Sequence, residues 1–175
     1  MQMAEHGGGE SIEVSVAIKA VDNEAEFRTL QELFAEYEAD LPAHLRHGAV
    51  PALPELVRTF AGNNRAFLAM AGGDAIGCIA VRDFDRESAL LLRLYVKPAR
   101  RGLGAARALV EAVIEFAREG KHSRVILDTN KEALDPAYRL YRSTGFTECK
   151  PFAAVTYECP TFMELRIKPV ADDRI

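Results

Sequence analysis

Residues 90–117 read LLLRLYVKPARRGLGAARALVEAVIEFA, and this stretch determines how the rest of the chain must be arranged. It opens with an apolar run ending at Val96, which is typical of a strand buried on both faces. Pro98 marks the end of that strand, because proline cannot donate to a ladder. From Leu103 to Ala117, apolar residues recur every three or four positions, the period of an amphipathic helix. The stretch therefore predicts a buried strand, a tight turn and a helix.

The turn between strand and helix has the features of an anion-binding site. Gly102 and Gly104 carry no Cβ, so the backbone can bend sharply and approach a ligand closely. The first turn of a helix leaves N–H groups without intrahelical partners and is the positive end of the helix dipole. Arg100 and Arg101 add positive charge beside it. We expect the turn to bind a phosphate or pyrophosphate; a solvated turn without a ligand is the alternative.

Two segments, in this order, resemble the motifs of the GNAT superfamily of N-acetyltransferases. The family's acyl-CoA pyrophosphate loop, Arg/Gln-x-x-Gly-x-Gly/Ala, is matched by Arg101-Gly102-Leu103-Gly104-Ala105-Ala106. The family's Ala-x-x-Leu-Tyr-x-x-x-Gly-Phe segment is matched by residues 137–146, AYRLYRSTGF. The resemblance extends from Ile12 to Lys168, which is nearly the whole chain. It implies acetyl-CoA as the cofactor and an amine of a small molecule or peptide as the acceptor.

The resemblance also implies the fold, an α/β protein of the α+β type with three layers. A mixed, mostly antiparallel sheet of about seven strands lies between about four helices. The parallel strands at 90–96 and 125–129 splay apart, and the acyl-pantetheine arm lies in the gap. We expect the backbone of Leu94, Tyr95 and Val96 to pair with that arm, much as a peptide adds to a sheet edge.

The remaining elements follow from hydrophobic period and from turn residues. Asn23 and Glu26 resemble a capping box that opens a helix, and Asp135-Pro136 resembles a helix start with the aspartate as cap. Residues 1–11 predict a disordered lead-in, followed by one domain at 12–170. The expected strands are 11–20, 66–71, 75–82, 125–129, 146–152 and 161–168; helices begin near Asn23, Pro54 and Asp135, and 41–50 is a loop.

Acetyl transfer from a thioester to an amine needs an oxyanion donor, a partner for the departing thiolate and a route for a proton. The resemblance assigns Tyr141 to the thiolate. A phenol with a pKa near 10 is a weaker acid than a thiol near 8.5, so we expect a hydrogen bond from Tyr141 rather than full proton transfer. A backbone N–H near Tyr95 or Val96 is the expected oxyanion donor. A core tyrosine without function is the alternative for Tyr141.

The general base is not evident from the motifs. Many GNAT relatives place a glutamate on the central strand, where this chain has leucines at 90–92. Arg93 and Tyr95 interrupt the apolar pattern on the face opposite Leu92 and Leu94, so we expect them to face the acceptor. Asp128 interrupts the other parallel strand and is a candidate to relay a proton through water; a local strand-end role is the alternative.

Three further side chains are candidates with weaker support. His44 and His47 have a suitable intrinsic pKa and fall in the loop expected to wall the acceptor site, although solvated histidines are the alternative. Leu134 stands where the family often has asparagine, and Asn130 is a candidate to replace it at a pantetheine amide.

Composition excludes several classes of function. The 175 residues carry a net charge of −4, which argues against nucleic acid as a partner, and no apolar run is long enough to span a membrane. Three cysteines without metal-ligand spacing predict no metal site and indicate reduced thiols in a cytoplasmic protein. The family resemblance suggests a homodimer.

Two rival functions stay open on the sequence. A non-catalytic acyl-CoA sensor on the same fold is motivated by the absent glutamate and asparagine. A dinucleotide-binding protein is suggested by the glycine turn followed by Asp128, but Arg107 occupies the position of the third glycine and no second βαβ unit follows.

Overall fold

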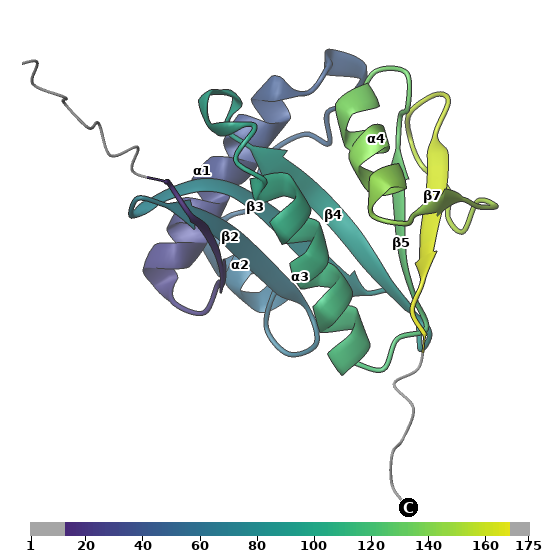
Figure 1. Cartoon of the computed structure of the whole chain (residues 1–175), viewed down its shortest axis with the longest axis horizontal. Coiled ribbons are helices and arrows are strands. Elements are labelled where there is room, and N and C mark those ends of the chain that lie inside the picture. The colour runs from purple at the N-terminus through teal and green to yellow at the C-terminus, as the bar shows by residue number, and fades with distance from the viewer. Residues whose placement is uncertain (1–12, 169–175) are drawn as a thin grey trace, which may run out of the picture.

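The computed structural model describes residues 13–168, and their organising element is a mixed sheet of seven strands (Figure 1). The strand order is β1-β2-β3-β4-β5-β7-β6. Of the described strand pairs, β4 with β5 is parallel and the other five are antiparallel, as expected. The strands are β1 (Val16–Ala20), β2 (Arg65–Ala71), β3 (Asp74–Asp83), β4 (Ser88–Val96), β5 (Arg124–Thr129), β6 (Thr147–Glu148) and β7 (Thr161–Arg166).

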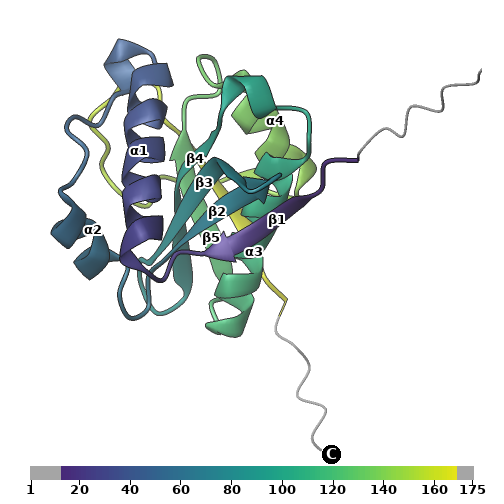
Figure 2. The same ribbon diagram turned by 90° about the vertical axis from the view of Figure 1, so that its left-hand side faces the viewer.

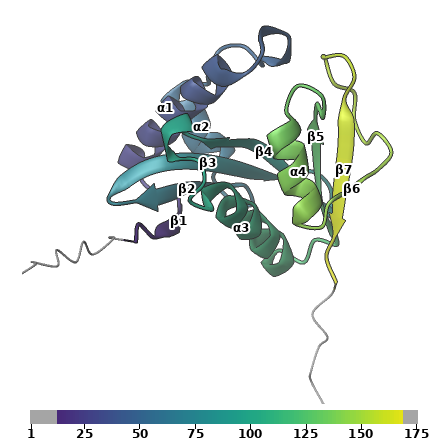
Figure 3. The ribbon, with the colours of Figure 1, turned by 45° about the horizontal axis from the view of Figure 1, so that its top comes forward.

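Four α-helices cover the two faces of this sheet and complete the three expected layers. Helices α1 (Glu24–Asp40) and α2 (Leu53–Thr59) lie on one face, while α3 (Ala105–Glu119) and α4 (Asp135–Ser143) lie on the other (Figures 2 and 3). Short 3-10 turns occupy Ala43–Leu45, inside the expected loop, and Pro98–Arg100, directly after β4.

Each face of the sheet has its own apolar core. On the α3 side, Leu109, Val110 and Val113 are fully buried against strand residues such as Leu127. On the α1 side, Leu30 and Phe34 pack against a second set of strand residues. Burying one such side chain contributes about 1.5–3 kcal/mol, so the helical spacing of apolar residues is what fixes each helix to its face.

The two parallel strands pair over a short length only. Ser88 lies opposite Arg124, and the last Cα pair joins Leu90 and Ile126, although β4 continues to Val96 and β5 to Thr129. Figure 1 shows the two strands converging at one end and separating toward the other. The separation confirms the splayed pair that the family resemblance implies.

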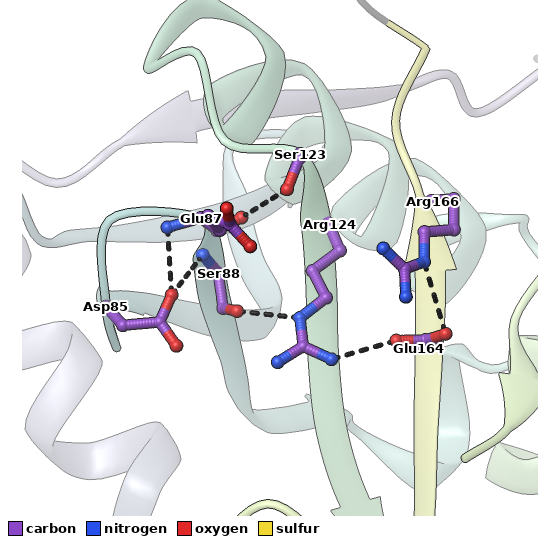
Figure 4. A network of polar contacts seen from close by, with 7 residues as sticks. All are labelled: Asp85, Glu87, Ser88, Ser123, Arg124, Glu164 and Arg166. Atoms are coloured by element: carbon purple, nitrogen blue, oxygen red, sulfur yellow. Dashed lines mark hydrogen bonds and ion pairs between the residues drawn. The ribbon is translucent and has the colours of Figure 1, made fainter.

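A network of polar contacts holds the closed end of this pair (Figure 4). Arg124 donates from Nε to the Ser88 hydroxyl (2.7 Å) and from Nη1 to Glu164 (2.9 Å), which joins β4, β5 and β7. Asp85 accepts from the backbone N–H groups of Glu87 and Ser88 and shapes the turn before β4. Because Ser88 is fully buried, its hydroxyl needs the hydrogen bond from Arg124. The network stabilises β4 and β5 at the end where they are paired.

Several element boundaries differ from the expectation. The first described strand begins at Val16, later than 11, and part of the expected range, like the lead-in at 1–11, lies outside the described residues. Asn23 caps α1 as expected, but Glu26 accepts from the Asp22 N–H and not from the cap residue itself. The expected strand at 146–152 shrinks to Thr147–Glu148.

The predicted cap of α4 is wrong by one residue. Leu134 is the N-cap, and Asp135 is the first helical residue, where its carboxylate pairs with Arg139 at 2.9 Å. Pro136 accordingly occupies the second helical position. A carboxylate in the first turn still stabilises the positive helix end. Asp135 therefore marks the start of the helix, as expected, but does not cap it.

Candidate active site

A cavity of about 650 Å³ lies where β4 and β5 separate. Strands β4 and β5, the C-terminal part of α1 and helix α4 supply its walls. A second cavity of about 350 Å³, beside β6 and β7, shares no lining residue with it. The expected site residues that line the larger cavity are Arg93, Leu94, Tyr95, Val96, Arg101, Ala106, Asp128, Tyr141 and His47.

The glycine turn forms an open cradle at the tip of α3. Gly104 is the N-cap with φ +80°, and Gly102 has φ +87°, so both adopt backbone conformations that favour glycine. The first helical hydrogen bond joins the Ala108 N–H to the Gly104 carbonyl (3.1 Å), which leaves the N–H groups of Ala105 and Ala106 without intrahelical acceptors. A Cβ built at either glycine would meet no atom within 4 Å. The tip is therefore free to accept an anion.

The two arginines of the turn have carboxylate partners. Arg101 donates to the Val96 carbonyl (3.0 Å) and to Asp40 on α1 (3.1 Å), and its side chain lines the cavity. Arg100 points elsewhere and pairs with Asp74 at 3.0 Å. Arg101 therefore ties the end of β4 to α1, and the groups nearest the glycines are the unpaired N–H groups of the helix tip.

A bulge interrupts β4 at Arg93. Cys78 lies opposite Tyr95 and Ala80 opposite Leu92, so β4 has one residue more than β3 between these pairs. Arg93 takes a positive φ of 52° to accommodate it. The expectation that Leu92 and Leu94 share a face is wrong for this reason: Leu92 packs with the α1-side core and Leu94 with the α3-side core.

The bulge directs two polar side chains toward α1. Arg93 donates to Glu38 at 3.2 Å, and its guanidinium lies 4.8 Å from the centre of the Phe34 ring, a cation–π contact. The Tyr95 hydroxyl donates to Glu36 at 3.3 Å. Burial, together with the nearby Glu36, raises the pKa of Tyr95 to about 12. Both side chains line the cavity on its α1 side, where they were expected to face an acceptor.

Glu38 organises this side of the cavity. Its two carboxylate oxygens accept from the backbone N–H of His47 and from Arg93, and the His47 ring contacts it at 2.8 Å through Nδ1. The His47 ring also stacks on Tyr37, with 6.0 Å between ring centres. His47 is thus fixed on the cavity wall by Glu38 and Tyr37, and the largely buried Glu38 carboxylate joins His47 to Arg93.

Asp128 is held on the opposite wall. The Tyr157 hydroxyl, from the loop before β7, donates to Asp128 Oδ2 at 2.7 Å and lies 3.2 Å from the Thr129 carbonyl. Burial and the Asp128 carboxylate raise the pKa of Tyr157, so this hydroxyl remains a donor. The contact orients Asp128 and leaves its charge facing the cavity.

Tyr141 lies at the base of α4 with its ring against Phe146, 5.7 Å between centres. The side chain is buried, and its hydroxyl has no hydrogen-bond partner among residues 13–168. The hydroxyl oxygen nevertheless keeps some exposure, since no fully buried side-chain polar atom in this range is unpaired. Since Tyr141 lines the cavity, the hydroxyl opens into it. Burial raises the pKa of Tyr141, so the group stays protonated and can donate to a new partner.

The sequence model of the Acetyltransferase (GNAT) family matches residues 28–146, about two thirds of the chain. The chain belongs to the GNAT acetyltransferase family.

Curated relatives of this GNAT acetyltransferase match it over less than half of its length. An uncharacterized N-acetyltransferase of Schizosaccharomyces pombe is 40% identical over 81 residues, 46% of this chain and 49% of the relative. The N-acetylaspartate synthetase of Rattus norvegicus is 36% identical over 81 residues, 46% of this chain and 27% of the relative. The chain matches about half the length of the first of these and about a quarter of the second.

Solved structures share the fold over almost the whole chain. A Salmonella typhimurium protein solved with its cofactor acetyl-CoA superposes with a TM-score of 0.73 at 22% identity, covering 90% of this chain and 96% of that one. A ribosomal-protein-alanine N-acetyltransferase of Brucella melitensis gives 0.70 at 22% identity, covering 86% and 99%. At these identities the likeness concerns the fold. The mostly antiparallel sheet also disagrees with the parallel sheet of a dinucleotide-binding fold.

Six expected site residues of this GNAT chain lie outside the cavity wall. His44 is an exposed residue of the 3-10 turn Ala43–Leu45. Asn130 accepts from the N–H groups of Glu132 and Ala133 at 3.1 and 2.9 Å, which uses its amide oxygen to shape the turn after β5. Gly102, Leu103, Gly104 and Ala105 also lie outside the wall of the larger cavity, as the adjoining turn.

Three site residues were missed from the sequence. Glu38 lies four residues after Phe34, in phase with the buried face of α1, and a charge on an apolar face was a usable signal. Tyr157 lies in a loop that has no hydrophobic periodicity. Arg82 lies near the end of β3, where a charged residue is ordinarily expected to face solvent. Only the fold brings Tyr157 into contact with Asp128 and places Arg82 on the wall of the same cavity.

Two further findings concern membrane spans and metal sites among the described residues. None of the helices within 13–168 combines the length and apolar character needed to cross a bilayer. Within the same range, no group of three or more His, Cys, Asp or Glu side chains is arranged to hold a metal ion.

Proposed function

We propose that this protein transfers the acetyl group of acetyl-CoA to an amine of a small molecule or peptide by direct attack within a ternary complex. The observation that carries the proposal is the cavity between the separated strands, which reaches from Arg101 and Ala106 beside the tip of α3 to Asp128 on β5. One end adjoins an anion cradle and the other carries charged groups suited to an acceptor.

The empty protein fits acetyl-CoA at three places. The tip of α3 offers unpaired N–H groups for a diphosphate. The edge of β4 beyond Leu90 has no strand paired to it on the β5 side, so the backbone groups of Leu94–Val96 that face away from β3 can bond to the amides of a pantetheine arm, beside the Arg101 contact to the Val96 carbonyl. The Tyr141 hydroxyl is open for a sulfur.

Bound acetyl-CoA supplies the thioester carbonyl: an N–C bond to the acceptor forms, the C–S bond breaks, and of the two protons lost by the ammonium one passes to the thiolate and one to solvent. A backbone N–H near Tyr95 or Val96 stabilises the oxyanion. Tyr141 donates a hydrogen bond to the departing sulfur. Asp128 holds the acceptor amine and relays its proton through water.

Release of CoA in the presence of acetyl-CoA and a broad amine panel tests the proposal. Amine-dependent appearance of free thiol supports an enzyme. Binding of acetyl-CoA, seen as a thermal shift, without turnover across the panel would favour the alternative, a non-catalytic acyl-CoA sensor. The sensor stays an alternative because β4 carries leucines at 90–92, where many relatives have a glutamate.

A homodimer and a cytoplasmic location stay predictions from the family resemblance and from composition. Light scattering after size-exclusion chromatography measures the first directly: a mass of about 39 kDa, twice the 19.3 kDa of the chain, is the expected result.

A further inference from the structure

The charges on the cavity wall are mostly neutralised by pairing. Arg101 is paired with Asp40 at 3.1 Å. Arg93 is paired with Glu38, which lies just behind the wall, at 3.2 Å. Each pair joins one cation and one carboxylate, so neither attracts a charged ligand as strongly as an unpaired group would.

Two charges of opposite sign are left over. Arg82, an exposed residue of β3 whose side chain reaches the cavity, forms no hydrogen bond or ion pair within the described range 13–168. Asp128 accepts from the Tyr157 hydroxyl, a neutral donor, and no cation pairs with it in that range. The empty cavity therefore presents one uncompensated guanidinium and one uncompensated carboxylate.

Register places these two charges on the same face of the sheet. Arg82 lies opposite Leu90, and Leu90 lies opposite Ile126, so the three form one row across β3, β4 and β5. Asp128 is two residues further along β5 and thus on the same face as Ile126. Regular spacing of two strands and two residue rises would put the Cα atoms of Arg82 and Asp128 about 12 Å apart, and the separation of β4 and β5 beyond Ile126 makes the distance larger than that. The length of the arginine side chain closes much of that distance, leaving room for one small molecule.

We propose that the acceptor is a small zwitterion of the amino-acid type, whose carboxylate binds Arg82 while its ammonium faces Asp128. The inference rests on the proposed acetyl transfer and names its substrate class. A simple polyamine would bring a second cation to Arg82, and an acceptor without a carboxylate would leave Arg82 unpaired. Arginine suits the role because its planar fork binds a carboxylate through two parallel hydrogen bonds. Tyr157 positions Asp128, and the ammonium held there lies beside the β4 edge where the thioester is expected.

The test measures CoA release by the full chain with matched acceptors at saturating acetyl-CoA. Each L-amino acid in the panel is paired with its decarboxylated amine, for example histidine with histamine. We expect the amino acids to be the better substrates. Arg82→Met should raise KM for the amino acid about tenfold or more and leave KM for the paired amine unchanged. Arg82→Lys, which keeps the charge, should recover part of the loss.

Arg86→Met is the matched control. Arg86 is an exposed arginine on the turn between β3 and β4 and lies outside the cavity wall, so its loss should leave both KM values unchanged. Amines turned over as well as their amino acids, or an equal effect of Arg82→Met on both, would overturn the zwitterion while leaving acetyl transfer intact. Acetyl-CoA binding without turnover of any amino acid would also overturn it. Absence of acetyl-CoA binding, read as no thermal shift, would overturn the proposed function and the inference together.

Discussion

Replacing Tyr141 with phenylalanine isolates a single hydroxyl at the proposed thiolate site. In the empty protein that hydroxyl has no partner within residues 13–168, so its removal breaks no internal hydrogen bond, and the ring keeps its packing against Phe146. The free energy of unfolding should change by less than about 0.5 kcal/mol. A hydrogen bond to a charged group contributes about 1.5–3 kcal/mol, so kcat should fall about tenfold to a hundredfold.

The assay is steady-state release of CoA, with KM for acetyl-CoA and Tm recorded for each variant. Because the bond to sulfur strengthens as the thiolate forms, kcat should fall while KM changes little. Tyr138→Phe is the matched control: Tyr138 lies one turn earlier on α4, outside the cavity wall, and donates to Glu148 at 2.8 Å. A Tyr141→Phe protein with unchanged kcat, or one with a large loss of Tm, would return Tyr141 to a purely structural role.

Arg101→Ala should raise KM for acetyl-CoA more than it lowers kcat, because it removes a remote anchor; initial rates decide, and a fall in kcat alone would contradict it. Gly104→Ala places a Cβ at φ +80°, which costs about 1–2 kcal/mol, and should also weaken acetyl-CoA binding. The control Gly73→Ala (φ +84°) should lower Tm by a similar amount and leave the affinity for acetyl-CoA unchanged. If the two variants bind acetyl-CoA equally well, the cradle is refuted. Lys19 lowers the pKa of Glu26 from 4.5 to about 2, so this stabilisation is present above pH 4.5 and lost toward pH 2. Glu26→Gln should accordingly lower Tm at pH 7 more than at pH 2; equal losses would exclude the ion pair.

Local signals were enough to predict the elements around the cofactor end. The glycine turn and helix α3 follow from residues adjacent in sequence: the apolar period of the helix, the proline that ends β4 and the glycines that need a positive φ. Gly104, for example, is a glycine because its own backbone takes a positive φ at the start of α3. For that reason the glycine turn and the start of α3 could be predicted from the sequence alone, and the parallel pair with its crossover helix followed from the same logic.

The acceptor end depends on contacts between residues far apart in the chain. The bond between Tyr157 and Asp128 spans 28 intervening positions, and Arg93 reaches Glu38 across a separation of 55 residues. No local period encodes such pairs. The same holds for Arg82, whose significance appears only once the other cavity charges are known to be paired. Sequence reasoning therefore named Arg93 and Asp128 but missed their partners Glu38 and Tyr157, and it missed Arg82.

The bulge at Arg93 has a physical reason that links the fold to the site. Leu91 packs with the α3-side core, so strict alternation would turn Arg93 toward that same apolar core. An unpaired guanidinium there would cost several kcal/mol, whereas a left-handed residue costs about 1–2 kcal/mol. The bulge is the smaller penalty, and it brings Arg93 to Glu38. It also turns Leu94 back to the α3 side, so that at the cavity β4 directs Arg93 toward α1 and Leu94 toward α3.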